Sequence, residues 1–191
     1  TPGTLNALTS YELSRFCAVN CGESFSLTSE VELSAVGVSH DTSDPCLFRI
    51  DTPDFAFASA TDLGVWTEQT AEALRDLDAL VLEFNHDIDM LRRGPYPHFL
   101  KKRVEGRKGH LSNWQAARLL EQVVTADLKV LVLAHLSDKN NTPELALEAA
   151  GGVLRGTDVR VQAATQKGGS DLFSVAPCHN ESLAGRQLPL L

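Results

Sequence analysis

The sequence predicts an α/β fold built around one sheet, because the spacing of its apolar residues changes partway along the chain. In the first half, apolar and polar residues alternate with a period of two, which is typical of antiparallel or mixed strands. These short runs, bounded by turn residues, cover 24–28, 31–38, 46–50 and 55–60. From Trp66 onward the period lengthens to that of a helix, and helices then alternate with short buried strands.

The second half supplies the remaining elements in order. A helix is expected over 66–77, a buried strand over 79–83 and a short basic helix over 97–104. Ser112 and Gln115 form a capping-box pair, and an apolar stripe follows at Ala116, Leu119, Leu120, Val123 and Val124. A strand over 129–134 precedes a helix that opens with Thr142, Pro143 and Glu144. Weak strands are predicted over 159–163 and 172–175.

Composition indicates one globular domain. The chain has 191 residues, of which 43% are hydrophobic and 22% charged, so residues 1–178 are expected to form part of a single domain, with 179–191 as a flexible tail. No apolar run approaches the ~20 residues of a membrane span, and no signal peptide opens the chain, which predicts a cytoplasmic protein. Its four cysteines are expected to be free thiols. The oligomeric state is not predicted.

The first residue, Thr1, is not an initiator methionine and lies in what resembles the interior of a structural element. A segment upstream of it is therefore expected.

Basic residues are concentrated in one segment of an acidic chain. The formal net charge is -8, yet 92–108 contains one acid and seven of the seventeen basic residues: Arg92, Arg93, Lys101, Lys102, Arg103, Arg107 and Lys108. Such a local patch is a candidate phosphate-binding surface. A solvated helix face is the alternative interpretation.

Several polar residues follow predicted strands directly. They are His40, Asp62, Glu83, His86 and His135. Because strand ends along one edge of a sheet converge, these side chains are expected to share a cleft. Imidazole and carboxylate together suit borderline metals such as zinc or manganese. Each residue taken alone is more often a turn former or a capped loop residue.

Four strings make the prediction more specific: ATDLG, LEFNHDIDMLRRGPYPHFLKKRV, GRKGHLSNWQAA and LAHLSDKNNTPELA. They resemble the YycJ (WalJ) group of metallo-β-lactamase-fold hydrolases, which is more distantly similar to tRNase Z. The resemblance runs from about Thr1 to about Val161. It implies a four-layer αββα sandwich, two divalent metal ions (zinc or manganese), and hydrolysis of a phosphodiester by metal-activated water. Nucleic acid is the implied substrate, with exonuclease-like action on DNA favoured.

The resemblance also implies roles for individual residues. His40 matches a ligand of the first metal, Asp62 the carboxylate that bridges both metals, and His135 a ligand of the second. Glu83 and His110 match a catalytic pair that protonates the leaving oxygen. His86 and Asp87 are interpreted either as hydrogen-bonding groups behind the ligands or as residues that fix their loop.

The string GHLSN has a physical interpretation of its own. His110, Ser112 and Asn113 lie at the start of a helix, where free N–H groups and the helix dipole favour an anion. The preceding basic segment leads into it, so Ser112, Asn113, Lys101, Lys102 and Arg103 are predicted to bind phosphate.

One departure from the family is large. The family's HxHxDH string is absent, and no two of the six histidines are separated by one residue. In the family that string lies shortly upstream of a segment like TPGTLNAL. Each metal would keep one histidine and Asp62, which predicts two ions in the complete protein and one or none in this chain.

Two alternative functions stay open. The same fold hydrolyses small thioesters, lactones or phosphoesters, and a closed apolar pocket near Phe84 and Trp114 would favour that function. Phe84 also stands where the family usually has a small polar residue. The other alternative is a catalytically incompetent fragment or binding module.

Overall fold

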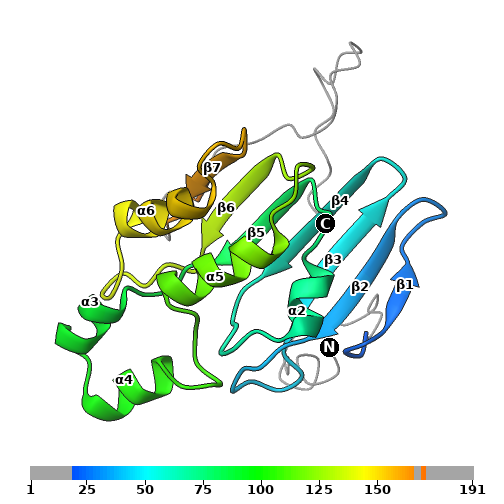
Figure 1. Ribbon diagram of the computed structural model, residues 1–191. Coiled ribbons are helices and arrows are strands. Elements are labelled where there is room, and N and C mark those ends of the chain that lie inside the picture. Colours follow the sequence, from blue (N-terminus) through cyan, green and yellow to red (C-terminus); the bar gives the residue numbers. More distant parts are fainter. Residues whose placement is uncertain (1–18, 166–168, 171–191) are drawn as a thin grey trace.

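A computed structural model describes residues 19–165 and 169–170 of the chain. Seven strands form one sheet in the order β1-β2-β3-β4-β5-β6-β7 (Figure 1). The first four strands pair antiparallel: β1 (Ser24–Ser26), β2 (Glu32–Gly37), β3 (Cys46–Thr52) and β4 (Phe55–Ala60). The last four pair parallel: β4, β5 (Ala79–Glu83), β6 (Val130–Ala134) and β7 (Arg160–Ala163). The expected mixed sheet is therefore confirmed.

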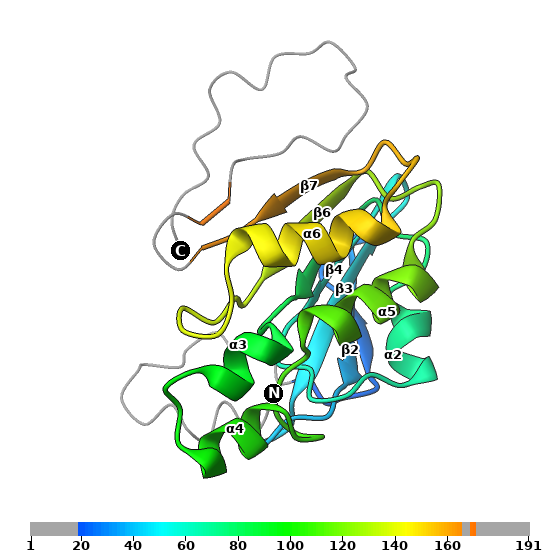
Figure 2. The same cartoon turned by 60° about the vertical axis from the view of Figure 1, so that its left-hand side comes forward.

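Three helices cover one face of this sheet (Figures 1 and 2). They are α2 (Glu68–Ala73), α5 (Asn113–Val123) and α6 (Pro143–Val153). Two further helices, α3 (Ile88–Arg93) and α4 (His98–Val104), project beyond the end of the sheet at which β5 ends. The described residues thus supply one sheet and one helical layer, which are two of the four layers expected from the resemblance.

The core lies between the central parallel strands and the covering helices. Leu80 and Leu82 of β5 and Leu131 and Leu133 of β6 are at most 1% exposed. They belong to one buried cluster with apolar residues of α5 and α6: Ala116, Leu119, Leu120, Ala146 and Ala150. Each buried leucine stabilises the fold by about 2 kcal/mol. This packing fixes where β5 and β6 end, and so where their terminal side chains lie.

Helix ends follow the predicted capping residues where those signals are complete. The Ser112 hydroxyl accepts from the Gln115 N–H, and the Gln115 side chain accepts from the Ser112 N–H, as the capping box requires. At the start of α6 the Thr142 hydroxyl accepts from the Leu145 N–H, and Pro143 occupies the first helical position.

One helix is shorter than predicted, and another was not predicted. The helix expected over 66–77 is limited to α2, because Thr67 caps it and the chain leaves the helix at Leu74. The short helix α3 was not predicted: Asp87 caps it and Gly94 ends it, which leaves too few residues for a visible helical period. The weak strand expected over 172–175, the boundary at 178 and the tail lie outside the described residues.

Candidate metal centre

Strand direction brings the predicted site residues to one edge of the sheet. Two antiparallel steps separate β2 from β4, so β2 runs parallel to β4, β5 and β6. All four strands therefore end at the same edge. His40 and Asp62 follow β2 and β4 by a few residues, Glu83 is the last residue of β5, and His135 follows β6 directly.

Asp62 lies at the centre of the cluster. Its Oδ1 atom is 3.4 Å from Nε2 of His40, 3.9 Å from Nδ1 of His110 and 3.8 Å from Nδ1 of His135. The ring centroids of His40 and His110 are 5.0 Å apart, and those of His110 and His135 are 4.9 Å apart. The three side chains on which the predicted site depends, His40, Asp62 and His135, are thus brought together.

Glu83 lies behind this cluster and is fully buried. Its Oε1 atom accepts hydrogen bonds from Nδ1 of His110 at 2.8 Å and Nδ1 of His135 at 2.9 Å, while Oε2 accepts from the Leu63 N–H. With their Nδ1 atoms protonated, both neutral rings carry a lone pair on Nε2, the atom free to bind a metal or a substrate.

These contacts shift the pKa values of the groups. Burial alone would raise the pKa of Glu83, but the hydrogen bonds from His110 and His135 outweigh it, and the net shift is downward. The Glu83 hydrogen bond raises the pKa of His135 above its ordinary value against the opposing effect of burial. Glu83 is consequently an anion at neutral pH that orients two imidazoles.

His40 is oriented by backbone rather than by a carboxylate. Its Nδ1 atom lies 3.0 Å from the Gly109 carbonyl, which can only accept, so the lone pair of the neutral ring is on Nε2 and is directed toward Asp62. A backbone carbonyl behind a ligand histidine is a common way to fix its tautomer.

Two glycines allow the loops of the site to approach each other closely. A Cβ on Gly64 would lie 2.3 Å from the Arg107 carbonyl oxygen, and one on Gly109 would lie 2.2 Å from those of Arg103 and Val104. Only glycine fits at such distances. The Gly64 N–H also donates to the Ser39 carbonyl. The loops after β2, β4 and α4 are therefore held together by main-chain contacts.

Backbone strain accompanies two of the site residues. Asp62 and His135 have φ values of 60° and 59°, in the left-handed region that non-glycine residues seldom adopt. Asp76, in a turn away from the site, has a similar φ of 53°. Strain alone does not mark function, but at Asp62 and His135 it coincides with convergence of donor atoms.

The donor atoms form two groups close enough to share a metal ion: His40, Asp62 and His110, and Glu83, His110 and His135, with the atoms of each group within 4.8 Å of one another. In the second group both Nδ1 atoms already donate to Glu83, so only the Nε2 atoms of His110 and His135 are left to bind a metal. Nitrogen and carboxylate donors fit zinc or manganese. His110, expected only as a proton donor, belongs to both groups.

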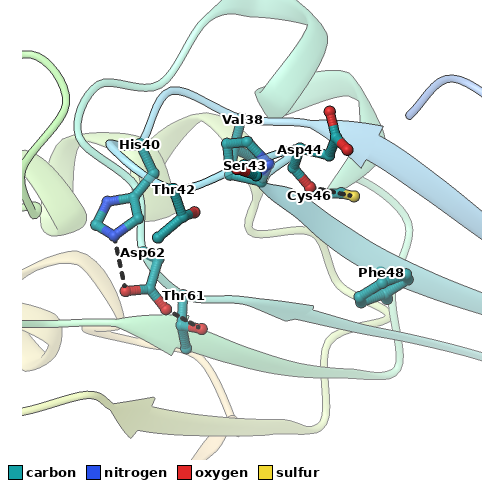
Figure 3. A pocket seen from close by; sticks show the side chains of 10 residues that line it. Val38, His40, Thr42, Ser43, Asp44, Cys46, Phe48, Thr61 and Asp62 are labelled. Carbon is teal, nitrogen blue, oxygen red and sulfur yellow. Dashed lines mark hydrogen bonds and ion pairs between the residues drawn. The ribbon is translucent and has the colours of Figure 1, made fainter. Parts of the chain in front are cut away.

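A pocket opens beside Asp62. It has a volume of about 460 Å³ and lies between the loop that follows β2 and the first residues of β3 (Figure 3). Its polar lining has hydroxyls, carboxylates and one imidazole but no lysine or arginine: His40, Thr42, Ser43, Asp44, Thr61 and Asp62. Phe84 is fully buried and Trp114 is 64% exposed. These two residues therefore do not form the closed apolar pocket that would have favoured a small-molecule substrate.

The basic segment is tied to the cluster through Asp41. Arg103 on α4 donates to Oδ2 of Asp41 at 2.6 Å, and Oδ1 of Asp41 lies 3.5 Å from Nε2 of His40. The Arg103 hydrogen bond lowers the pKa of Asp41. The three basic residues predicted to bind phosphate differ in how available they are. Arg103 is paired with Asp41, Lys101 donates to the Arg92 carbonyl, and Lys102 is exposed.

Among the described residues, Lys102, Arg107 and Lys108 are exposed and form no ion pair. They are therefore the basic side chains of this segment that are most available to an anion.

Four other predicted site residues have structural contacts. The Ser112 side chain caps α5, and the Asn113 amide exchanges two hydrogen bonds with Asn141. Both are nearly inaccessible, which argues against direct contact with a phosphate. Asp87 caps α3. His86 is fully buried, and neither ring nitrogen has a partner within the described ranges, so it supports no ligand through a hydrogen bond.

Sequence reasoning missed Asp41, Gly64 and Gly109 as parts of this site. Gly64 lies in the string ATDLG and Gly109 in GRKGHLSN, so both could have been noticed as members of the family strings. Their function, however, depends on contacts between loops that are distant in sequence. Asp41 follows His40 directly, yet its partner Arg103 is 62 residues away.

Comparisons with known proteins identify the family of the chain. Residues 6–136 match the family model described as the beta-lactamase superfamily domain. The chain is similar to a protein named exodeoxyribonuclease YycJ from Bacillus anthracis, at 36% identity over 125 residues, covering 65% of this chain and 47% of that protein. The chain spans about half the length of the curated relatives it matches.

Solved structures agree on the fold. The metallo-beta-lactamase fold protein YhfI from Bacillus subtilis superposes with a TM-score of 0.60 at 15% identity, covering 87% of this chain and 59% of that one. Zinc-bound PqqB from Methylobacterium extorquens superposes with a TM-score of 0.51 at 17% identity, covering 76% and 52%. None of the helices within the described ranges has the length and apolarity needed to span a membrane.

Proposed function

We propose that this chain, which belongs to the beta-lactamase superfamily, contributes the active site of a metal-dependent hydrolase. The proposed reaction is cleavage of phosphodiester bonds at a DNA end. The observation that carries the proposal is the convergence of His40, Asp62 and His135 at one rim, beside His110 and linked to the basic helix α4 through Asp41. The relatives named exodeoxyribonucleases support the choice of DNA.

The residues present fit divalent metals. Three imidazoles and two carboxylates converge on one rim, and both Glu83 and the Gly109 carbonyl fix the tautomers that leave a lone pair toward the cluster. When bound there, a divalent ion supplies Lewis acidity and lowers the pKa of water. We infer that His40, Asp62 and His135 are ligands.

His110 and Glu83 are proposed to move the proton. Glu83 is fully buried, so it cannot touch the substrate and acts through the imidazole to which it is bonded. A protonated His110, stabilised by the Glu83 carboxylate on Nδ1, presents its Nε2 proton toward the rim. Transfer of that proton to the leaving oxygen leaves the neutral tautomer that Glu83 already favours.

The surface of α4 fits a polynucleotide. Lys102 is exposed, and Arg107 and Lys108 continue the basic surface toward His110. Phe99 on the same helix is 73% exposed and is three and four residues from Lys102 and Arg103, so the three share one helical face. An exposed aromatic ring among cations can stack on an unpaired base, which we propose is how a single-stranded end is held.

A small-molecule substrate is the second candidate, because the pocket beside Asp62 is within the size range of ligand sites. Its hydroxyl-rich lining could accommodate a small phosphoester, thioester or lactone. Substrate competition separates the nuclease proposal from the small-molecule alternative. A small phosphodiester should inhibit DNA cleavage only weakly if the basic surface of α4 contributes most of the free energy of DNA binding.

Asp62→Ala tests the metal site. In the full-length protein it is expected to reduce metal-dependent cleavage of a DNA end at least about 1,000-fold, because Asp62 is near the donors of both groups. Initial rates over a manganese and zinc titration measure this. Turnover close to the parent's would contradict the site.

Replacing Lys102, Arg107 and Lys108 with Ala tests the substrate class. Loss of up to three phosphate contacts should lower the log–log salt slope of DNA binding by about 2–3. Cleavage of a small phosphodiester should be unchanged, and replacing Arg75 and Arg118 on other surfaces serves as the control. Equal losses on both substrates would indicate damage to the site rather than loss of a DNA surface.

A further inference from the structure

Two cysteines far apart in the sequence lie side by side beside the candidate metal centre. The Sγ atoms of Cys21 and Cys46 are 3.1 Å apart. Both are free thiols, and the Cys46 thiol is also 3.4 Å from the Asp44 carbonyl. A disulfide has an S–S distance of about 2.05 Å, so closure requires a movement of only about 1 Å.

A glycine makes this contact possible. Gly37 pairs with Cys46 in the β2–β3 register, and the chain around Cys21 runs along the other side of β2, where the Gly22 N–H donates to the Ala35 carbonyl. A Cβ on Gly37 would lie 3.5 Å from the Cys21 Cβ. The Cys21 side chain therefore lies over Gly37 and reaches the next strand, where a bulkier residue would oppose it.

We propose that Cys21 and Cys46 form a reversible disulfide in the wall of the pocket beside Asp62, by exchange with a low-molecular-weight disulfide. Cys46 lines the same pocket as His40 and Asp62 (Figure 3). This thiol modification site is independent of the proposed nuclease function, because it depends only on the position of the two sulfurs.

The order of reaction follows from exposure. Cys21 is exposed, so its thiolate attacks one sulfur of the small disulfide and releases one small thiol. Cys46 then attacks the Cys21 sulfur of the mixed disulfide, the second small thiol leaves, and the Cys46 proton passes to it. Two protein thiols are oxidised and one small disulfide is reduced to two thiols.

The environment of Cys46 is consistent with its acting second. Burial, aided by the neighbouring Cys21 sulfur, raises the pKa of the Cys46 thiol to about 12. Once Cys21 is in a mixed disulfide, its sulfur no longer raises the pKa of Cys46, and the Cys46 thiol is more readily deprotonated.

Oxidation by glutathione disulfide tests the proposal. Full-length protein carrying Cys17→Ser and Cys178→Ser is incubated with glutathione disulfide while folded, and is expected to lose about 2 Da and to give one peptide pair joining Cys21 to Cys46. Dithiothreitol should restore the mass. Any further cysteines of the full-length protein are followed by the same peptide map.

Matched variants separate the pair from general thiol reactivity. With Cys46→Ser, the exposed Cys21 should retain a glutathione adduct instead of resolving it. Gly37→Val keeps both thiols but places methyl groups against Cys21, and is expected to slow cross-linking at least about 10-fold. Circular dichroism confirms that each variant is folded.

Two outcomes would overturn the proposal. One is separate glutathione adducts on Cys21 and Cys46 of the parent with no linked peptide. The other is linkage that occurs only in denaturant, since the proposal requires the folded arrangement. DNA cleavage is not needed for either readout, so failure of the nuclease proposal would leave this result interpretable.

Discussion

The two ends of β5 each have a carboxylate, and the two carboxylates have different partners. Asp78, just before the strand, accepts from the Lys129 ammonium and from the Ala56 N–H. Glu83, at its end, is fully buried and accepts from two imidazoles. A lysine is a cation at all ordinary pH values, whereas an imidazole changes its charge near neutrality. Asp78 is therefore suited to stabilising the fold, and Glu83 to orienting imidazoles that bind a metal or transfer a proton.

The difference extends to the surroundings of each end. Near Asp78 the chain makes strand pairs and a turn in which one residue, Asp76, has a positive φ. Around Glu83 the loops are instead held by close backbone approach at Gly64 and Gly109. Unfavourable φ values occur at Asp62 and His135 on that rim. The rim thus places five polar side chains together at a cost in local stability that the leucine core offsets.

Glu83→Gln is expected to have the largest effect among changes that probe this comparison. An amide cannot accept from both imidazoles as a carboxylate does, so His110 and His135 lose their fixed tautomers. Zinc affinity should fall by about 10- to 100-fold. Isothermal titration calorimetry measures it, and Asp78→Asn, which changes the carboxylate at the other end of the strand, should leave zinc affinity unchanged.

His86→Leu tests the neighbouring buried histidine. Burial lowers the pKa of His86 to about 4, whereas the unfolded chain titrates near its ordinary value, so the unfolded state binds more protons between these values. Stability therefore falls as pH drops from about 6.5 to 4, and the parent should lose about 2 kcal/mol between pH 7 and pH 5 that the variant retains.

Urea unfolding at both pH values measures this effect. The variant should be about as stable as the parent at pH 7, because the His86 ring has no hydrogen-bond partner in the described part of the chain. Equal pH dependence of parent and variant would show that His86 is protonated or solvated in the folded protein.

Asp78→Asn is expected to have the smallest effect, a loss of about 1 kcal/mol at pH 7. Burial alone would raise the pKa of Asp78, but the Lys129 hydrogen bond and the Ala56 N–H lower it overall. A lowered folded pKa stabilises the protein above the unfolded pKa, and this stabilisation is lost as pH falls through the folded value. The stability difference between parent and variant should accordingly vanish in acid, as thermal unfolding from pH 7 to pH 2 would reveal.

Elements with complete local signals were predicted well. The strand Phe55–Ala60 and the strand Ala79–Glu83 have the predicted bounds, and the caps of α5 and α6 are the predicted residues. Short elements with weak periodicity, such as α3, were missed because two turns of helix contain too few apolar positions to define a face.

The sequence by itself determined which residues can end strands, cap helices and donate to a metal, because those properties depend on neighbours along the chain. It therefore indicated His40, Asp62, Glu83 and His135 without coordinates. Only the tertiary structure decided that His110 joins both donor groups, that Ser112 and Asn113 are used internally, and that Arg103 is paired with Asp41. Those outcomes depend on contacts between segments distant in sequence, which the packing of β5 and β6 against α5 and α6 brings into register.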